Sequence, residues 1–253
     1  AKFRTEPIVR LGQPYERSRA AEEIKRILDL LIDNGYRLSR YDYENSGAYE
    51  YLSTGGFSLF FSFSIGRQYF FGDPRVRVEP PRDDITPELE LRHLEFLPGD
   101  VYSREKKMLS ERNLNRLGLF ESARIEPAAD WDSSASTAIP MEILVRPRFR
   151  NELAPEIIVS NENNAFNLGL GLGYTNHNFF GDARTFVTQV RARTQSISQL
   201  LHGQTFRDTT TVGTVEFQFQ ILQPYLFTRS LSASWTSAIS AEKSKRPGYS
   251  ILP

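Results

Sequence analysis

The chain contains no cysteine, and its 31 basic and 31 acidic side chains leave no net charge. Without cysteine there can be no disulfide and no thiolate metal site, although this does not identify the compartment. The balanced charge provides no basic surface of the kind that binds nucleic acid, so we expect no nucleic-acid partner. The sequence also has no run of eighteen apolar residues, which excludes a transmembrane helix.

Charge is distributed unevenly along the 253 residues. Residues 1–149 hold 46 charged side chains and residues 150–253 hold 16. The sequence thus has a charged front and a charge-poor back rich in Ser, Thr, Gly, Asn and aromatic residues. We place the change in character near Arg150 and expect different kinds of domain on its two sides.

Four segments of the back half alternate between apolar and polar or small residues. In Phe166–Tyr174, apolar side chains are separated by Asn167, Gly169, Gly171 and Gly173. A period of two predicts a strand with one apolar face. Residues 186–193, 214–221 and 231–239 repeat the pattern at about the ten-residue length of a membrane-crossing strand. An apolar face opposite Gln, Arg and Glu is typical of a barrel wall between lipid and a wet lumen.

The front half shows one order of elements twice. Ile8–Leu11 reads as a short strand, and Glu16–Asn34 reads as a helix that ends at Gly35. Strands are then expected at Tyr36–Tyr43 and Phe57–Ile65. The second copy comprises a strand at 69–79, a strand or strand end at 91–96, helices in 103–118 with Ser103 as N-cap, and strands at 123–126 and 141–145.

Two segments of the second copy carry a resemblance to a known family. Leu97–Ser103 and Leu114–Phe120 resemble the "pGdvYs" turn and the "lG.F" helix-to-strand segment of POTRA (polypeptide-transport-associated) domains. Asn178–Gly181 is similar to the "N.fG" turn of the barrel that accompanies these domains. Gln223–Tyr225 and Arg246–Tyr249 resemble segments of the translocation-and-assembly-module-like branch. The chain is thus similar to the outer-membrane assembly barrel superfamily, which includes barrel-assembly-machinery subunits.

The resemblance implies an α+β fold of POTRA modules, each β-α-α-β-β, followed by the N-terminal strands of an antiparallel transmembrane β-barrel. We expect modules at 6–66 and 67–149 and barrel strands in 156–253. Four strands do not close a barrel, and the chain starts at Ala1, so we expect a piece of a longer protein. The implied location is the outer membrane of a Gram-negative bacterium, with the modules in the periplasm.

The implied activity is the insertion or export of β-rich client proteins by strand exchange. Implied partners are outer-membrane lipid, unfolded barrel or secreted clients, and periplasmic or lipoprotein subunits. In this family the first barrel strand pairs weakly with the last and forms a lateral gate. We take the glycine segment to be that first strand, with Asn167, Gly169, Gly171 and Gly173 as gate residues, because glycine weakens a strand and its register. The alternative is that the glycines make room for a lumen plug or a bend.

A second candidate lies in the first module. Ser58, Phe60, Ser62 and Ser64 would face one side of a strand that exposes backbone donors and acceptors if it lies at a sheet edge. Such an edge could bind a client by adding a strand. The alternative is an ordinary core strand.

No catalytic, cofactor-binding or metal-ligating residues are predicted. His93, His177 and His202 have no ligand spacing with acidic residues. The Gly169–Gly173 segment lacks the GxGxxG spacing, and neither a GxSxG elbow nor a P-loop occurs. We therefore expect no enzyme activity in the chain.

Three other functions remain open from the sequence. The barrel could be a dedicated secretion pore for one exoprotein, which a client-specific phenotype would reveal. It could anchor an enzyme whose catalytic domain precedes Ala1. The chain could instead be a soluble α+β binding module, in which case residues 150–253 would form a closed soluble sheet.

Overall fold

The computed structural model describes residues 6–51, 55–162, 165–194, 213–227 and 231–243. The chain divides into two compact units. The first comprises Ala1–Pro81, Ile85–Leu114 and Ser122–Arg146, and the second comprises Arg82–Asp84, Asn115–Glu121 and Pro147–Pro253. Both expected front modules contribute to the first unit. The Arg246–Tyr249 segment that resembles the assembly-module branch lies outside the described residues.

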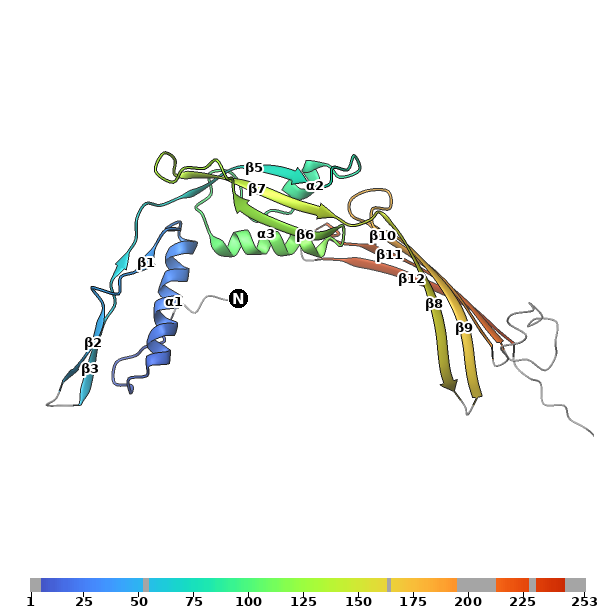
Figure 1. The fold of residues 1–253 in the computed structure, drawn as a ribbon, viewed down its shortest axis with the longest axis horizontal. Coiled ribbons are helices and arrows are strands. Elements are labelled where there is room, and N and C mark those ends of the chain that lie inside the picture. The colour runs from blue at the N-terminus through green and yellow to red at the C-terminus, as the bar shows by residue number, and fades with distance from the viewer. Residues whose placement is uncertain (1–5, 52–54, 163–164, 195–212, 228–230, 244–253) are drawn as a thin grey trace, which may run out of the picture. The chain divides into compact units, whose positions relative to one another are not determined.

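The first part of unit one consists of a helix beside short strands (Figure 1). Helix α1 spans Arg17–Asp33, within one residue of the predicted bounds at each end. Gly35 ends it with φ +93°, a left-handed conformation that glycine adopts readily. The strands that follow are β1 (Arg40–Tyr41), β2 (Gly47–Tyr51), β3 (Gly56–Phe60) and β4 (Phe63–Ser64). They form two antiparallel pairs, β1 with β4 and β2 with β3.

The predicted strand at Ile8–Leu11 is wrong. The segment forms bends and a turn, and the backbone N–H of Ile8 donates to the carboxylate of Glu23 in α1 at 2.8 Å. Pro7 and Gly12 flank the segment, and neither residue favours an extended ladder. The first module therefore does not show the expected β-α-α-β-β order in its described residues.

The second part of unit one has the order strand, helix, helix, strand, strand. Its elements are β5 (Phe70–Val78), α2 (Pro87–Arg92), α3 (Arg104–Arg116), β6 (Phe120–Pro127) and β7 (Ala138–Pro147). The strand predicted at 91–96 is wrong, because α2 covers its start. Helix α3 is one piece, and the predicted N-cap is present, since Ser103 Oγ accepts from Lys106 N at 3.2 Å.

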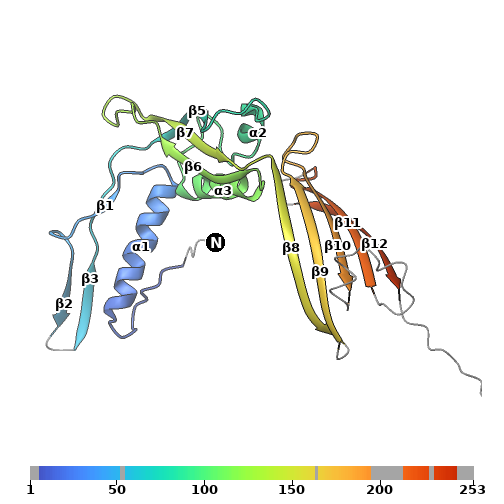
Figure 2. The ribbon, with the colours of Figure 1, turned by 45° about the vertical axis from the view of Figure 1, so that its right-hand side comes forward.

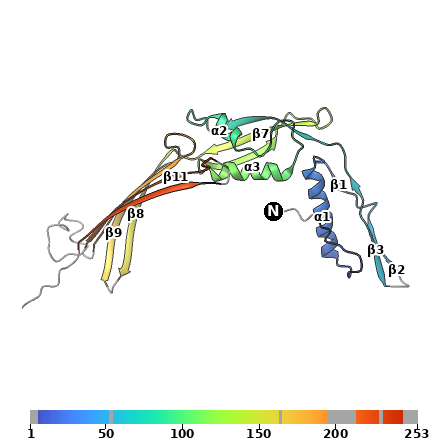
Figure 3. The same ribbon diagram turned by 180° about the vertical axis from the view of Figure 1, so that it is seen from behind.

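A three-stranded sheet of order β5-β7-β6 holds the core of this part, and β5 runs parallel to β7. Along β7 every second side chain is buried, namely Ile139, Met141, Ile143 and Val145. Helix α3 runs along one face of the sheet in views from opposite sides (Figures 1 and 3). Phe71 and Phe96 stack in the core with ring centroids 3.9 Å apart. The burial of these β7 side chains thus follows from the apolar face of the strand and from helix α3, which lies along the sheet.

Unit two is a five-stranded antiparallel sheet (Figure 2). Its strands are β8 (Asn151–Glu162), β9 (Ala165–Asn176), β10 (Thr185–Thr194), β11 (Gly213–Gln223) and β12 (Ala233–Lys243). Neighbours in sequence are neighbours in the sheet, so β8 and β12 are its edges. The four alternating segments predicted from the sequence correspond to β9–β12. None of the described helices is long and apolar enough to span a membrane.

Candidate functional site

The sheet of unit two exposes one apolar face. The pairing places Ile157 of β8 opposite Leu170 of β9, Leu172 opposite Val190 of β10, and Val190 opposite Phe217 of β11. Side chains on this face remain exposed, as Ile157 at 77% and Leu170 at 52% show. The exposed apolar residues of this face are Leu153, Ile157, Val159, Leu170, Leu172, Val190, Phe217, Trp235 and Ile239. A continuous apolar surface of this kind indicates contact with lipid or another protein.

Aromatic side chains gather at one end of the same sheet. The β9–β10 turn carries Phe180 and the β11–β12 turn carries Phe227, both largely exposed. The register places both turns at the end where β8 begins, because Asn151 pairs with Asn176 and Thr185 pairs with Leu222. Aromatic residues at the end of an apolar strand surface are typical of a membrane interface.

The opposite face of the sheet is polar and ion-paired. Glu156 of β8 accepts from Arg191 Nε of β10 at 2.9 Å and from Gln189 Nε2 at 3.2 Å. Beside it, Arg193 of β10 pairs with Glu216 of β11. Gly169, Gly171 and Gly173 of β9 lie between these strands on the same face. Two ion pairs on this face thus form between strands of the sheet itself.

The predicted glycine strand is present but is not the first strand. Asn167, Gly169, Gly171 and Gly173 all lie in β9, which pairs with β8 on one side and β10 on the other. The first strand of this sheet is β8, which begins at Asn151, ahead of the predicted start near Glu156, and which the sequence does not mark by strict alternation. Pro155 and the three consecutive apolar residues Ile157–Val159 conceal its alternation in the sequence. The open edge at this end of the sheet therefore belongs to β8.

The glycines of β9 occupy crowded positions. A Cβ built at Gly169 would lie 2.6 Å from the Ala192 carbonyl oxygen and 2.7 Å from Arg193 Cγ. A Cβ at Gly171 would lie 3.0 Å from Glu156 Oε2. At these two positions glycine does make room for neighbouring atoms. Those atoms belong to the adjacent strands of the sheet, not to a lumen plug.

A hydrogen-bonded cluster joins residues 82–84 to the start of the sheet. Arg82 donates to the Asp84 carboxylate at 2.6 and 2.9 Å, and this holds the pKa of Asp84 below its ordinary value. Asn178 Nδ2 donates to the Asp84 carbonyl at 2.9 Å, and Asn178 Oδ1 accepts from Ala183 N at 3.2 Å. Arg82 also donates to the Arg148 carbonyl. The sequence singled out the Asn178 turn but gave no sign of its partner at residue 84.

The edge candidate of the first module is divided between two strands. Ser58 and Phe60 lie in β3, Ser64 lies in β4, and Ser62 lies between them. The prediction of one strand over Phe57–Ile65 is wrong. At the break, Ser62 N donates to Ser46 Oγ at 2.9 Å and the Ser62 carbonyl accepts from Asp42 N at 3.0 Å. Here the chain passes from β3, which pairs with β2, to β4, which pairs with β1.

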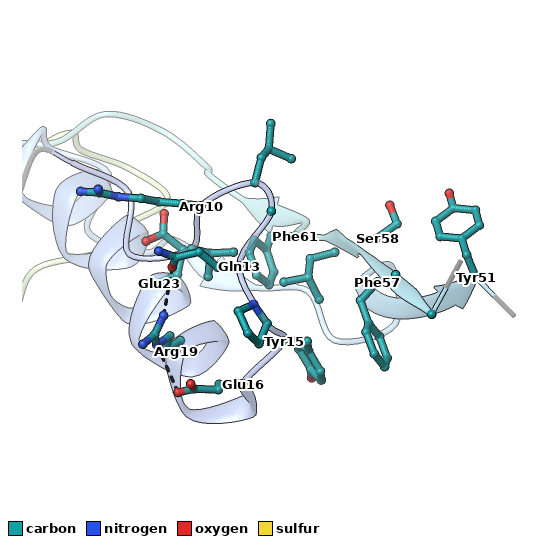
Figure 4. Close-up of a pocket in the computed structure, with 17 residues that line it drawn as sticks. Arg10, Gln13, Tyr15, Glu16, Arg19, Glu23, Tyr51, Phe57, Ser58 and Phe61 are labelled. Atoms are coloured by element: carbon teal, nitrogen blue, oxygen red, sulfur yellow. Dashed lines mark hydrogen bonds and ion pairs between the residues drawn. The ribbon is translucent and has the colours of Figure 1, made fainter. Parts of the chain in front are cut away.

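Within the described residues, β3 pairs only with β2, so its other edge has no strand partner. A pocket of about 550 Å³ lies beside it, between the 9–16 segment, the start of α1 and residues 55–61 (Figure 4). Tyr15 stacks on Phe57 with ring centroids 4.8 Å apart, and Arg19 is held by Glu16 at 3.1 Å and Gln13 at 3.0 Å. The unpaired edge and the aromatic lining make this a candidate site for an extended peptide.

In the part of the chain that the structure describes, no group of three or more His, Asp or Glu side chains is arranged to bind a metal ion. His177 Nε2 lies 3.2 Å from Glu152 of β8, and His93 Nδ1 lies 2.6 Å from the Leu89 carbonyl.

Known structures contain the same arrangement of elements. The chain is similar to BamA from Haemophilus ducreyi lacking POTRA domains 1–3, with a TM-score of 0.52 and 13% identity over 92% of this chain and 46% of that one. The chain shares the fold of BamA. The likeness is one of fold, in line with the resemblance that the sequence indicated.

Two further structures match with lower scores. The POTRA3–5 fragment of Haemophilus influenzae BamA is 18% identical over 55% of this chain and 52% of that one, with a TM-score of 0.40. CdiB from Acinetobacter baumannii is 13% identical over 92% of this chain and 42% of that one, with a TM-score of 0.39. No protein-family model matches the sequence, and no curated protein matches it. The chain spans about half the length of these structures.

Proposed function

We propose that this chain is part of an outer-membrane protein that assembles or translocates β-rich client proteins. The observation that carries the proposal is the five-stranded sheet, whose exposed face is apolar and whose other face is ion-paired. Lipid stabilises the first face and water the second. Exposed aromatics at the strand ends, such as Phe180 and Phe227, suit the lipid–water interface. The BamA-like fold supports the same location.

The proposed site of client contact is the open edge of β8. An edge strand presents unpaired backbone N–H and C=O groups that another strand can satisfy. Within the described residues β8 pairs only with β9, through twelve residue pairs from Asn151–Asn176 to Glu162–Ala165. A client strand that adds to this edge would gain ladder hydrogen bonds as it enters the membrane. The energy would come from client folding, and we assign no catalytic step to the chain.

The front of the chain would present clients or partner subunits to this edge from the periplasm. We assign residues 67–149 as a POTRA module, because its elements follow the order strand, helix, helix, strand, strand. Residues 6–66 would form a second, reduced module. The unpaired edge of β3, with Ser58 and Phe60, would bind an extended segment next to the pocket of Figure 4.

Depletion of the intact protein in its own cells tests the proposal. The levels of all outer-membrane proteins are measured as the protein disappears, with a depleted protein of the inner membrane as control. A fall of many barrel proteins supports general assembly, and loss of one exoprotein would replace it with a dedicated secretion pore. An unchanged outer membrane, with the protein recovered in the soluble fraction, would contradict the proposal and favour a soluble binding module.

A further inference from the structure

An ion pair crosses the sheet from β8 to β10 without involving a side chain of β9. Arg191 donates to Glu156 through Nε at 2.9 Å and through Nη2 at 3.5 Å, and Gln189 donates to the same carboxylate at 3.2 Å. Arg191 and Glu156 are both paired with Gly171 in the ladder. The two charged side chains therefore meet over the glycine.

A side chain at Gly171 would crowd this contact. A Cβ there would lie 3.0 Å from Glu156 Oε2, 3.2 Å from Glu156 Cβ and 3.3 Å from Arg191 Cγ. Two residues along the strand, a Cβ at Gly173 would make only ordinary contacts with Ala154, at 3.6 and 3.7 Å. The same substitution at these two positions thus affects the ion pair differently.

The ion pair can exist in only one register of β8. A slip of one residue would move Glu156 to the apolar face, because side chains alternate between faces. A slip of two residues would move it about 7 Å along the sheet, beyond hydrogen-bond reach of Arg191. One such slip would bring Glu156 toward Arg193, which already pairs with Glu216. Because Arg193 is already paired with Glu216, the slipped register is less favourable than the observed one.

We propose that Glu156 and Arg191 are positioning residues that hold the edge strand β8 in register against the glycine strand. The inference deepens the proposed function and rests on it, because the register of β8 sets where a client strand begins to pair. Gly171 then does more than weaken the strand. It lets Arg191 of β10 reach past β9 and bind Glu156 of the edge strand.

Disulfide trapping in the intact protein in its native membrane tests this inference, and residues 1–253 contribute no cysteine of their own. Ile157→Cys is combined with Leu170→Cys, its partner in the observed register, or with Leu168→Cys or Leu172→Cys, which report slips of two residues. These residues lie on the apolar face, away from the ion pair. We expect Glu156→Gln and Gly171→Ala each to lower the yield of the 157–170 disulfide about two- to fivefold, the scale of a partly exposed ion pair.

Two controls separate the ion pair from general weakening of the strand. Gly173→Ala should leave the 157–170 yield unchanged, and the charge-reversed pair Glu156→Arg with Arg191→Glu should restore it. Equal effects of Gly171→Ala and Gly173→Ala would overturn the inference, as would an unchanged yield with Glu156→Gln or no recovery in the charge-reversed protein. The recovery also shows that a loss in the single variant is not a failure to fold.

The trapping yields require no client, so the inference and the proposed function can fail separately. Reduced yields together with normal levels of outer-membrane proteins would leave the register role in place and contradict the assembly function. Unchanged yields together with impaired assembly would leave the function in place and overturn the register role.

Discussion

Glu90 of α2 provides a test of the packing in the second module. Its side chain is fully buried, and neither carboxylate oxygen has a hydrogen-bond partner among the described residues. Burial raises the pKa of Glu90 to about 7 from the ordinary value of 4.5. Substitution by Gln removes the ionisation while it retains the shape of the side chain, so we expect Glu90→Gln to change how stability depends on pH.

The direction follows from which state loses its proton first. Below pH 4.5 the carboxyl is protonated in both the folded and the unfolded protein, so its ionisation costs nothing. Between pH 4.5 and 7 the unfolded protein ionises first, and the free energy of unfolding falls. Well above pH 7 both states are ionised, and the full cost is about 3.5 kcal/mol, because the pKa rises by roughly 2.5 and each step of one costs ~1.4 kcal/mol.

Glu90→Gln lacks this fall. A buried amide without partners carries its own cost of about 1–3 kcal/mol, but that cost is the same at every pH. Hydrogen exchange of the amides in residues 70–147 is measured on the intact protein at pH 4.5, 6 and 8, with correction for intrinsic exchange. We expect the difference in stability between Glu90→Gln and the unchanged protein to grow by about 3 kcal/mol in favour of the variant from pH 4.5 to 8.

The control is Glu88→Gln, which removes an exposed carboxylate from the same helix. It leaves Glu90 buried and removes only the smallest cause of the raised pKa of Glu90, so most of the pH dependence should remain. A parallel pH dependence in Glu90→Gln and the unchanged protein would refute the reasoning. It would mean that Glu90 is solvated or paired in solution.

Two further substitutions test the backbone and the polar cluster. Gly35→Ala should destabilise the protein well beyond the roughly 1 kcal/mol expected for Gly118→Ala. Hydrogen exchange of the amides around each substituted residue measures the two losses of stability. Both glycines have positive φ, but only at Gly35 would a Cβ meet backbone, 2.9 Å from the Tyr69 carbonyl oxygen; equal effects would contradict this geometry. Asn178→Ala should lower the temperature at which the protein loses its folded mobility on a gel, because it removes bonds to the Asp84 carbonyl and to Ala183 N, at roughly 1–3 kcal/mol; an unchanged temperature would show that this cluster is not formed.

Local patterns in the sequence were enough to predict part of the fold. The apolar spacing in Glu16–Asn34 and the glycine that follows predict α1 to within a residue at each end. Strict alternation predicts the position of β9 and the faces of its side chains. Ser103 and Gly118 likewise mark the two ends of α3. Each of these features depends on neighbours within a few residues in the sequence.

Features that depend on distant partners could not be predicted in this way. The consecutive apolar residues Ile157–Val159 conceal the alternation of β8, so the sequence predicts the glycine strand as the first. The strand expected at Ile8–Leu11 is absent, and Ile8 N bonds to Glu23 in α1. The contact between Glu156 and Arg191 joins residues 35 positions apart and requires the register of three strands.

Photo-crosslinking from the edge of the sheet tests the central claim most directly. A photoactivatable residue replaces Ile157 of β8 or Val190 of β10, which lie on the same exposed face but on an edge strand and an interior strand respectively. Newly made outer-membrane proteins are then followed in cells that carry the intact protein. The account predicts crosslinks to these clients from position 157 and few from position 190. Equal crosslinking from both positions, or crosslinks from position 190 alone, would contradict the assignment of β8 as the strand that receives clients.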